Sequence, residues 1–324
     1  MEYIDIITEA PFTPDIDKQA EKHFITANTI AGNLPEMKSV HIIPVFNKDN
    51  EPTISHTDFI ESMQDVSADF FHGEHILKPT IRLSHSIQGR VPEAKNKPAN
   101  QLFDWEKTIY YARMAFAIEI PTIQSGIDGN ILSLTVGGVK SYHLDNLYSK
   151  NKSDQHFKLF IGYKNRVCCN MCVSTDGYMG EVEVGSIAEL RAMMYSLFQS
   201  YNAQQHLHQM EQLAKYSLTE QQFAQLIGRC RMYNHLPNEQ KAEIPQMLFG
   251  EQQMNTVVKD YYRDESFCKN QDGTINLWRL YNLFTGANKS SYIDSFLDRG
   301  VNAFHLVEQI RYGLENKNHS WYLN

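Results

Sequence analysis

The spacing of hydrophobic and polar positions changes near residue 186. Before this point, short apolar segments are interrupted by Gly, Pro, Asn and Asp, which is typical of strands joined by turns. After it, apolar residues recur with the longer period of amphipathic helices. The pattern predicts an α+β fold in which an antiparallel β-rich N-terminal part packs against a helical C-terminal part. We therefore divide the chain into an N-terminal arm (1–39), a β-rich part (40–186) and a helical part (187–324).

The first predicted elements are a strand at His41–Phe46, followed by a polar turn, and a helix that Ser55 or Thr57 caps and that reaches about Phe70. The segment TIRLSHSI then alternates as one strand. One predicted face carries Ile81, Leu83, His85 and Ile87. The other carries Arg82, Ser84 and Ser86.

Two hairpins are predicted next. A strand that begins near Met114 places one set of residues on each face: Met114, Phe116, Ile118 and Ile120, against Ala115, Ala117 and Glu119. The turn SGIDGN joins it to ILSLTV. Only KN separates HFKLFIGY from RVCCNMCV, so these segments also pair antiparallel, because parallel strands need a crossover of a dozen residues or more. Gly137 and Gly138 predict a turn or bulge.

The helical part opens with two capping boxes, at Ser186–Glu189 and Thr219–Gln222. The first predicts a helix to about Tyr216 and the second a helix that ends near Tyr233. Further helices are predicted at Gln252–Arg263, Ile275–Phe284, Ser291–Leu297 and Asn302–Leu314. The segment GANKSSY resembles a phosphate loop, but Asn288 stands where Gly is needed before Lys289, so we interpret it as a helix end at Gly286 and a new start at Ser290 or Ser291.

Composition limits the classes of function. With 42% hydrophobic residues the chain can bury a large core, and its net charge of −8 argues against broad, non-specific adhesion to nucleic acid or anionic membrane. The N-terminus lacks a secretory signal, and no apolar run is long enough to span a bilayer. We expect a cytoplasmic protein without a membrane partner, whose five cysteines are reduced thiols.

Three of these cysteines lie in RVCCNMCV. If Arg166–Val173 is a strand, Cys168 and Cys172 are roughly 13 Å apart, too far to share one ion, at about 3.3 Å per residue. A tetrahedral zinc site also needs two more ligands, and no second cysteine pair exists. We interpret the cluster as buried core and predict neither a metal site nor a cofactor.

The densest basic stretch is His72–Lys97, which has a local net charge of +3. Arginine beside hydroxyl groups suits phosphate contacts, and bases can stack on aromatic rings, which are plentiful in this chain. The predicted nucleic-acid-binding residues are therefore Lys78, Arg82, Arg90, Lys95 and Lys97. The alternative is an ordinary solvated sheet face and loop.

A rival hypothesis is a hydrolase-like enzyme with a polar pocket around Arg82, His85 and Glu119. A carboxylate on a face of small residues can act as a general base. Glu119 could equally pair with Arg82 or Arg113 as a structural bridge, and His85 is more simply a hydrogen-bonded core histidine. The sequence contains no hydrolase, metalloprotease or kinase motif, so we assign no catalytic residue.

Several long blocks resemble a bacterial family known only as a domain of unknown function. They are IRLSHSIQGRVPEA, MAFAIEIP, LSLTVGGVKSY, NRVCCNMCVSTDGY, AQLIGRCRMY, INLWRLYNLFTGANKSSYIDSFLDR and SWYLN. The chain is more distantly similar to phage/plasmid-type proteins of unknown function, through NRVCCN and LWRLYNLFT. The resemblance implies a mobile-element setting and carries no functional residues across.

The leading hypothesis is a non-catalytic module that binds nucleic acid, with single strands the first to test, or a protein partner. The enzyme is the main rival. A third possibility is an interaction protein that uses the exposed face of the Gln-rich segment between Gln199 and Gln225.

Overall fold

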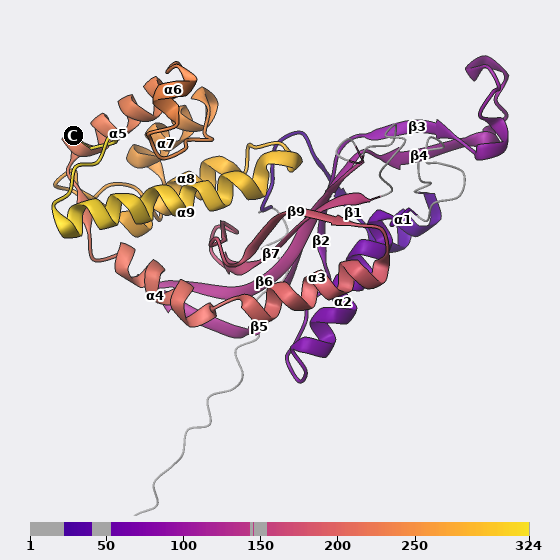
Figure 1. Ribbon diagram of the computed structural model, residues 1–324, viewed down its shortest axis with the longest axis horizontal. Helices are drawn as coiled ribbons and strands as arrows, with labels where there is room; N and C mark the ends of the chain where they lie inside the picture. Colours follow the sequence, from indigo (N-terminus) through magenta and orange to yellow (C-terminus); the bar gives the residue numbers. More distant parts are fainter. Residues whose placement is uncertain (1–22, 41–52, 143–144, 146–153, 324) are drawn as a thin grey trace, which may run out of the picture.

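The computed structural model describes residues 23–40, 53–142, 145 and 154–323. Within them, a curled antiparallel sheet runs diagonally through the molecule (Figure 1) in the order β1-β2-β5-β6-β7-β8, with β9 also paired to β7. Its strands are β1 (Ile30–Gly32), β2 (Thr80–Leu83), β5 (Arg113–Ile127), β6 (Asn130–Ser141), β7 (Gln155–Asn165), β8 (Met171–Cys172) and β9 (Tyr178–Val184). This arrangement, with helices following the sheet, confirms the α+β prediction.

The β5–β6 hairpin forms as predicted. Asp128 and Gly129 both have positive φ, 47° and 76°, at the two central positions of a tight turn, a conformation that suits Asp-Gly. The alternation along β5 also holds. Met114, Phe116, Ile118 and Ile120 belong to the main core, whereas Ala115 and Ala117 belong to a second cluster on the other face.

Gly137 and Gly138 do not form the predicted turn or bulge, because they lie inside β6 and pair regularly on both sides. A Cβ atom at Gly137 would lie 2.1 Å from the carbonyl oxygen of Phe116, and one at Gly138 would lie 2.5 Å from the Phe59 ring. A side chain at either position would clash, so glycine is needed for β5 and Phe59 to pack this closely against β6.

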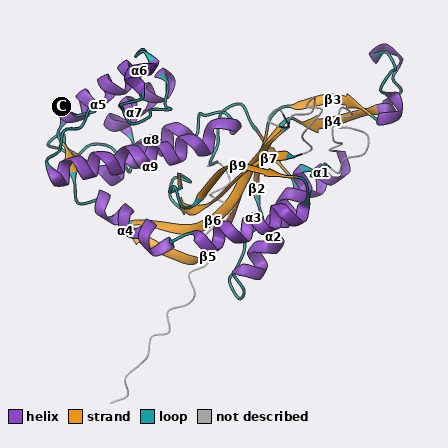
Figure 2. Ribbon diagram, viewed as in Figure 1, coloured by secondary structure: helices purple, strands orange, loops and turns teal. Residues whose placement is uncertain are grey.

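Helices cover both faces of the sheet (Figure 2). The helices α2 (His56–Phe70) and α3 (Ile187–Ser200) pack on one face through the main core. Phe24, Ile25 and the start of α9 (Ile293–Asn316) pack on the other. Ser55 caps α2 with a reciprocal box through Asp58, which confirms the first predicted helix.

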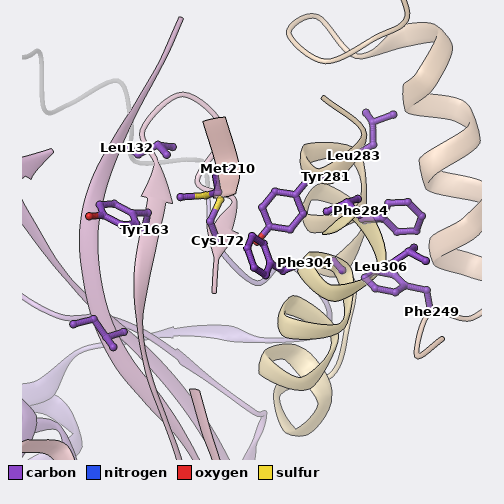
Figure 3. Packing of buried hydrophobic residues seen from close by; sticks show 14 of the residues in the cluster. Leu132, Tyr163, Cys172, Met210, Phe249, Tyr281, Leu283, Phe284, Phe304 and Leu306 are labelled. Atoms are coloured by element: carbon purple, nitrogen blue, oxygen red, sulfur yellow. The ribbon is translucent and has the colours of Figure 1, made fainter. Parts of the chain in front are cut away.

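The helical part contains α4 (Ala203–Leu213), α5 (Glu220–Tyr233), α6 (Asn238–Lys241), α7 (Glu251–Arg263) and α8 (Leu277–Asn288), followed by α9. A short pair, β10 (Ser217–Leu218) and β11 (Ile275–Asn276), joins two of its loops. Its core continues into that of the sheet, since Cys172, Met210 and Tyr281 meet between β8, α4 and α8 (Figure 3).

Several helix predictions are wrong in extent. The helix predicted to reach Tyr216 is broken after Ser200, because Asn202 caps a new helix, α4, by accepting a hydrogen bond from the Gln205 amide at 3.0 Å. The last two predicted helices are one, α9. Gly300, between the two predicted ranges, lies inside α9, where a Cβ would be 3.7 Å from the side-chain amide nitrogen of Asn288. Likewise, α8 continues past Gly286 to Asn288, and the residue that precedes α9 is Tyr292 rather than a serine.

The two capping boxes of the helical part differ. At Thr219 both hydrogen bonds with Gln222 are present, as predicted. At Ser186 the hydroxyl accepts from the Glu189 amide, but the Glu189 carboxylate accepts from Gly185 instead of Ser186. The Ser186 cap is therefore one-sided.

The segment TIRLSHSI is not one uninterrupted strand. It forms β2 and then β3 (Ser86–Arg90), which pairs with β4 (Lys107–Tyr111). The register does not change across the break, because Leu83 pairs with Met114 and Ser86 with Tyr111. The pair β3–β4 thus continues β2–β5 beyond the sheet as a projecting hairpin (Figure 1). His85, predicted to be a core histidine, is exposed because the segment leaves the sheet there.

The prediction of a strand over Arg166–Val173 is wrong, although its pairing direction is right. Residues 166–168 form a turn, Cys169 has a φ of 59°, and within this segment β8 is the part that pairs with β7. The chain reverses direction between Asn165 and Asn170, and backbone hydrogen bonds of Asn165 close this turn. Its amide donates to the Asn170 carbonyl at 2.9 Å, and its carbonyl accepts from Cys169 at 2.8 Å.

Several predictions fall outside these residues. The strand at His41–Phe46 lies outside the described ranges, as does most of the N-terminal arm, and the three-part division stays a prediction. Helix α1 (Leu34–Val40) lies at the end of that arm. In the part of the chain that the structure describes, no helix is long and apolar enough to cross a membrane.

Candidate functional site

The five predicted nucleic-acid-binding residues fall into two groups. Lys78 and Arg82 lie at the sheet, before and within β2, whereas Arg90, Lys95 and Lys97 lie at the far end of the projecting hairpin. They do not form one basic stripe.

Arg82 is unavailable to a phosphate. Its side chain is 5% exposed and donates to Thr29, to the hydroxyl at 3.0 and 2.8 Å and to the carbonyl oxygen at 2.7 Å. These bonds tie residues near β1 to the sheet, so Arg82 has a structural role.

The hairpin tip, residues 91–106, is built around a carboxylate. Glu106 is covered by the tip and accepts hydrogen bonds from Lys97 Nζ at 2.9 and 2.8 Å and from the Phe103 amide at 2.8 Å. The bonds from Lys97 lower the pKa of Glu106. Arg90 donates to the Lys97 carbonyl. Two predicted cations are thus occupied in holding the tip together, and Lys95 stays exposed.

The tip presents two aromatic rings that the sequence interpretation missed. Phe103 and Trp105 are 58% and 71% exposed, with ring centres 6.0 Å apart and planes inclined by 13°. Ile87 and Ile109 on the hairpin strands are exposed as well. The sequence feature that could have indicated this pair is LFDWE, in which two aromatic residues lie two positions apart at the end of a polar, proline-containing loop.

The residues of the predicted enzyme pocket do not converge. Arg82 pairs with Ala115, and Glu119 lies four residues further along β5. That separation is roughly 13 Å at about 3.3 Å per residue. Glu119 binds Lys164, with Arg166 at 4.0 Å, rather than Arg82 or Arg113, and Arg113 binds Asp294. His85 contacts Asn28 at 2.8 Å.

Glu119 does line a small cavity of about 60 Å³, together with Lys78 and Lys164, on the sheet face that carries Ala117. A larger groove of about 640 Å³ follows α9 and the segment after it, and a neighbouring cavity of about 270 Å³ shares its His305 and Pro245. In the groove His305 is hydrogen-bonded to Thr175, and Glu308 forms an ion pair with Arg311 at 3.0 Å. Among the described residues, none of these three cavities brings a nucleophile together with a base and a group that orients the base.

The cysteine cluster is part of the core. Cys172 is fully buried, and burial raises its pKa; burial also raises the pKa of Cys168 to about 11. The residues described contain no group of three or more His, Cys, Asp or Glu placed to hold a metal ion. Lys289, from the GANKSSY segment, donates to the Cys168 carbonyl and ties the end of α8 to the β7–β8 turn.

The family model described as "Domain of unknown function, B. Theta Gene description (DUF3871)" matches residues 6–323. No curated protein and no solved structure matches the chain. The match confirms the resemblance to a family of unknown function and adds no functional residue. Since the model spans almost the whole sequence, this chain belongs to the DUF3871 family.

Proposed function

We propose that this protein is a non-catalytic binding module and that its partner contacts the hairpin tip. The observation that carries the proposal is the exposure of Phe103 and Trp105 on a tip that Lys97 and Glu106 hold together from within. Large apolar side chains exposed side by side mark interaction surfaces, and aromatic residues dominate the binding energy of interfaces.

Order within the tip supports this role. Three short helical turns, Pro92–Ala94, Ala99–Gln101 and Asp104–Glu106, follow one another there. The Val91 amide donates to the Glu106 carbonyl at 2.9 Å and closes the base of the tip. A preorganised surface loses less conformational entropy when it binds, so the rings are presented at low entropic cost.

The partner that the charges favour is a protein. Residues 86–111 carry four cations and three carboxylates, a net charge of +1. Lys97 is paired with Glu106, and Lys107 lies 2.6 Å from Asp104. Nucleic-acid affinity depends on several free cations that displace counterions, whereas protein interfaces centre on aromatic residues with few free charges.

The mobile-element setting and the cytoplasmic location implied by the sequence belong to the same proposal. In that setting the partner is a second protein of the element. The pocket residues first considered for an enzyme do not converge, so we propose no catalytic activity.

The test is site-specific photo-crosslinking in the native host. A photoreactive amino acid replaces Trp105 in one variant, and Tyr312, also exposed, in a control. A third variant carries it at Gln204, exposed on the Gln-rich helix α4. We expect one protein adduct from position 105 alone, lost when Phe103 is also changed to Ala. An adduct from position 204 only would favour the Gln-rich face.

Titration with single- and double-stranded oligonucleotides at about 50 mM salt tests the nucleic-acid alternative, because phosphate contacts weaken steeply as salt rises. Binding abolished by Trp105→Ala would make nucleic acid the partner of the tip. Absence of both protein adducts at position 105 and oligonucleotide binding would contradict the proposal.

A further inference from the structure

We infer that the cavity beside Glu119 binds a single phosphate group. It is lined by Lys78, Thr80, Glu119, Thr135 and Lys164, with Phe24, Leu77, Ala117 and Cys169 completing the wall. It lies away from the hairpin tip, so the inference does not depend on the proposed function.

Sheet register explains why polar groups gather here. Thr80 pairs with Ala117 across β2 and β5, and Glu119 pairs with Thr135 across β5 and β6. Gly162 pairs with Thr135 from the other side, and Lys164 follows two residues later on the same face. Small residues thus form a shallow floor with long polar side chains around it.

The charges around the cavity are unequal. Lys164 contacts the Glu119 carboxylate, and Arg166 Nε lies 4.0 Å from its second oxygen. Lys78 is exposed and forms no ion pair within the described residues. Three cations therefore surround one carboxylate in a chain whose net charge is −8. The excess positive charge attracts an anion, since ammonium and guanidinium groups form strong hydrogen bonds to phosphate oxygens.

The size of the cavity selects a small group. Its volume is about 60 Å³. A water-sized sphere takes about 10–15 Å³ in this measure, so the cavity holds a group of roughly four to six heavy atoms. A phosphate group has five. The hydroxyl of Thr80, at the rim, is a further donor to its oxygens.

Replacement of Glu119 should change the affinity for phosphate in a direction that can be tested. A phosphate bound here has Lys78 and Lys164 as partners and is repelled by the Glu119 carboxylate. Replacing Glu119 by Gln removes the repulsion and frees Lys164, so phosphate binds more tightly. A cavity that held a cation would respond in the opposite direction.

Calorimetric titration with inorganic phosphate, at constant ionic strength, tests the inference on the full chain. We expect weak binding by the wild type, at least a several-fold loss in Lys78→Met and a several-fold gain in Glu119→Gln. Lys158→Met is the matched control, because Lys158 lies on the same sheet face but binds Asp298 at 2.5 Å, outside the cavity. Equal thermal midpoints of the wild type and Lys78→Met exclude an effect of folding.

Parallel titrations with a nucleoside monophosphate and with a short oligothymidylate identify the source of the phosphate group. The inference is overturned if none of the three ligands binds, if Lys78→Met binds as well as the wild type, or if Glu119→Gln binds less. Changing Trp105 to Ala leaves phosphate binding unchanged, which separates this site from the hairpin tip.

Discussion

Lys97 and Glu106 form an ion pair at the hairpin tip, and the same ammonium lies 4.0 Å from the centre of the Phe103 ring. One lysine thus neutralises a covered carboxylate and packs on an exposed aromatic ring. The pair connects the two sides of the tip across nine residues of sequence. It explains how a segment far from the main core can present Phe103 and Trp105 in a fixed arrangement.

Breaking this pair should loosen the tip without unfolding the protein. In Lys97→Met or Glu106→Gln we expect limited proteolysis within residues 91–106 to become several-fold faster. Local opening of the tip then no longer requires the ion pair to break, so the open state is more populated. The midpoint of global denaturation should stay the same. Lys95→Met is the control, since Lys95 is exposed at the same tip. Equal cleavage rates in all variants would show that the pair does not hold the tip.

The cysteine cluster should bind no metal. Cys172 lies in the core beside Tyr281 and Met210, and no cluster of three ligands exists in the described residues (Figure 3). Metal analysis of protein purified without chelator should find well under one zinc per chain. A stoichiometric ion that disappears in Cys172→Ala would refute this prediction.

The helix caps at Thr219 and Ser186 should each stabilise the fold. Both hydroxyls accept an amide hydrogen bond at 3.2 Å, and loss of such a cap typically destabilises a protein by about 1 kcal/mol. We expect Thr219→Ala and Ser186→Ala to lower the free energy of unfolding by that amount in urea denaturation. Unchanged midpoints in both variants would mean that solvent replaces the caps.

His206 should make the protein sensitive to acid. Its imidazole is fully buried against Tyr201 and Phe304, and burial lowers its pKa from 6.5 to about 4. Below pH 6.5 the unfolded chain binds a proton that the native state excludes, so stability falls as pH falls. From about pH 7 to about pH 5 we expect the wild type to lose roughly 2 kcal/mol more than His206→Gln.

The control for His206 is His208→Gln, which changes an exposed histidine of the same helix. Denaturation at several pH values should give this variant the acid dependence of the wild type. If His206→Gln shows that dependence too, the buried imidazole does not cause it.

Lys140 should make the free energy of unfolding depend on pH in the alkaline range. Its ammonium is fully buried, 3.2 Å from both Asp145 and Gln155, and burial lowers its pKa from 10.5 to about 8. Above pH 8 the native state releases a proton that the unfolded chain keeps up to pH 10.5, so this lysine adds stability as pH rises. Relative to Lys140→Met, the wild type should gain about 2 kcal/mol between about pH 7 and about pH 10. A constant difference between the two proteins would contradict this assignment.

Features that depend on near neighbours in the chain could be predicted from the residues. The alternation of Met114 to Ile120 placed each side chain on the correct face, because a strand has a period of two wherever it lies. The Thr219 box was predictable because both partners lie within one helical turn. The family of unknown function was also recognisable, because its blocks extend along most of the chain.

Features that depend on distant residues could not be predicted in this way. Glu119 is paired with Lys164, 45 positions away, because β6 lies between their strands and sets the register. Arg82 has the chemistry of a phosphate ligand, but Thr29, 53 positions away, accepts the hydrogen bonds that its guanidinium donates. The exposure of Phe103 and Trp105 follows from β3–β4 continuing past the edge of the sheet. Local pattern sets the period of an element, whereas partners and exposure depend on where the folded chain places the other elements.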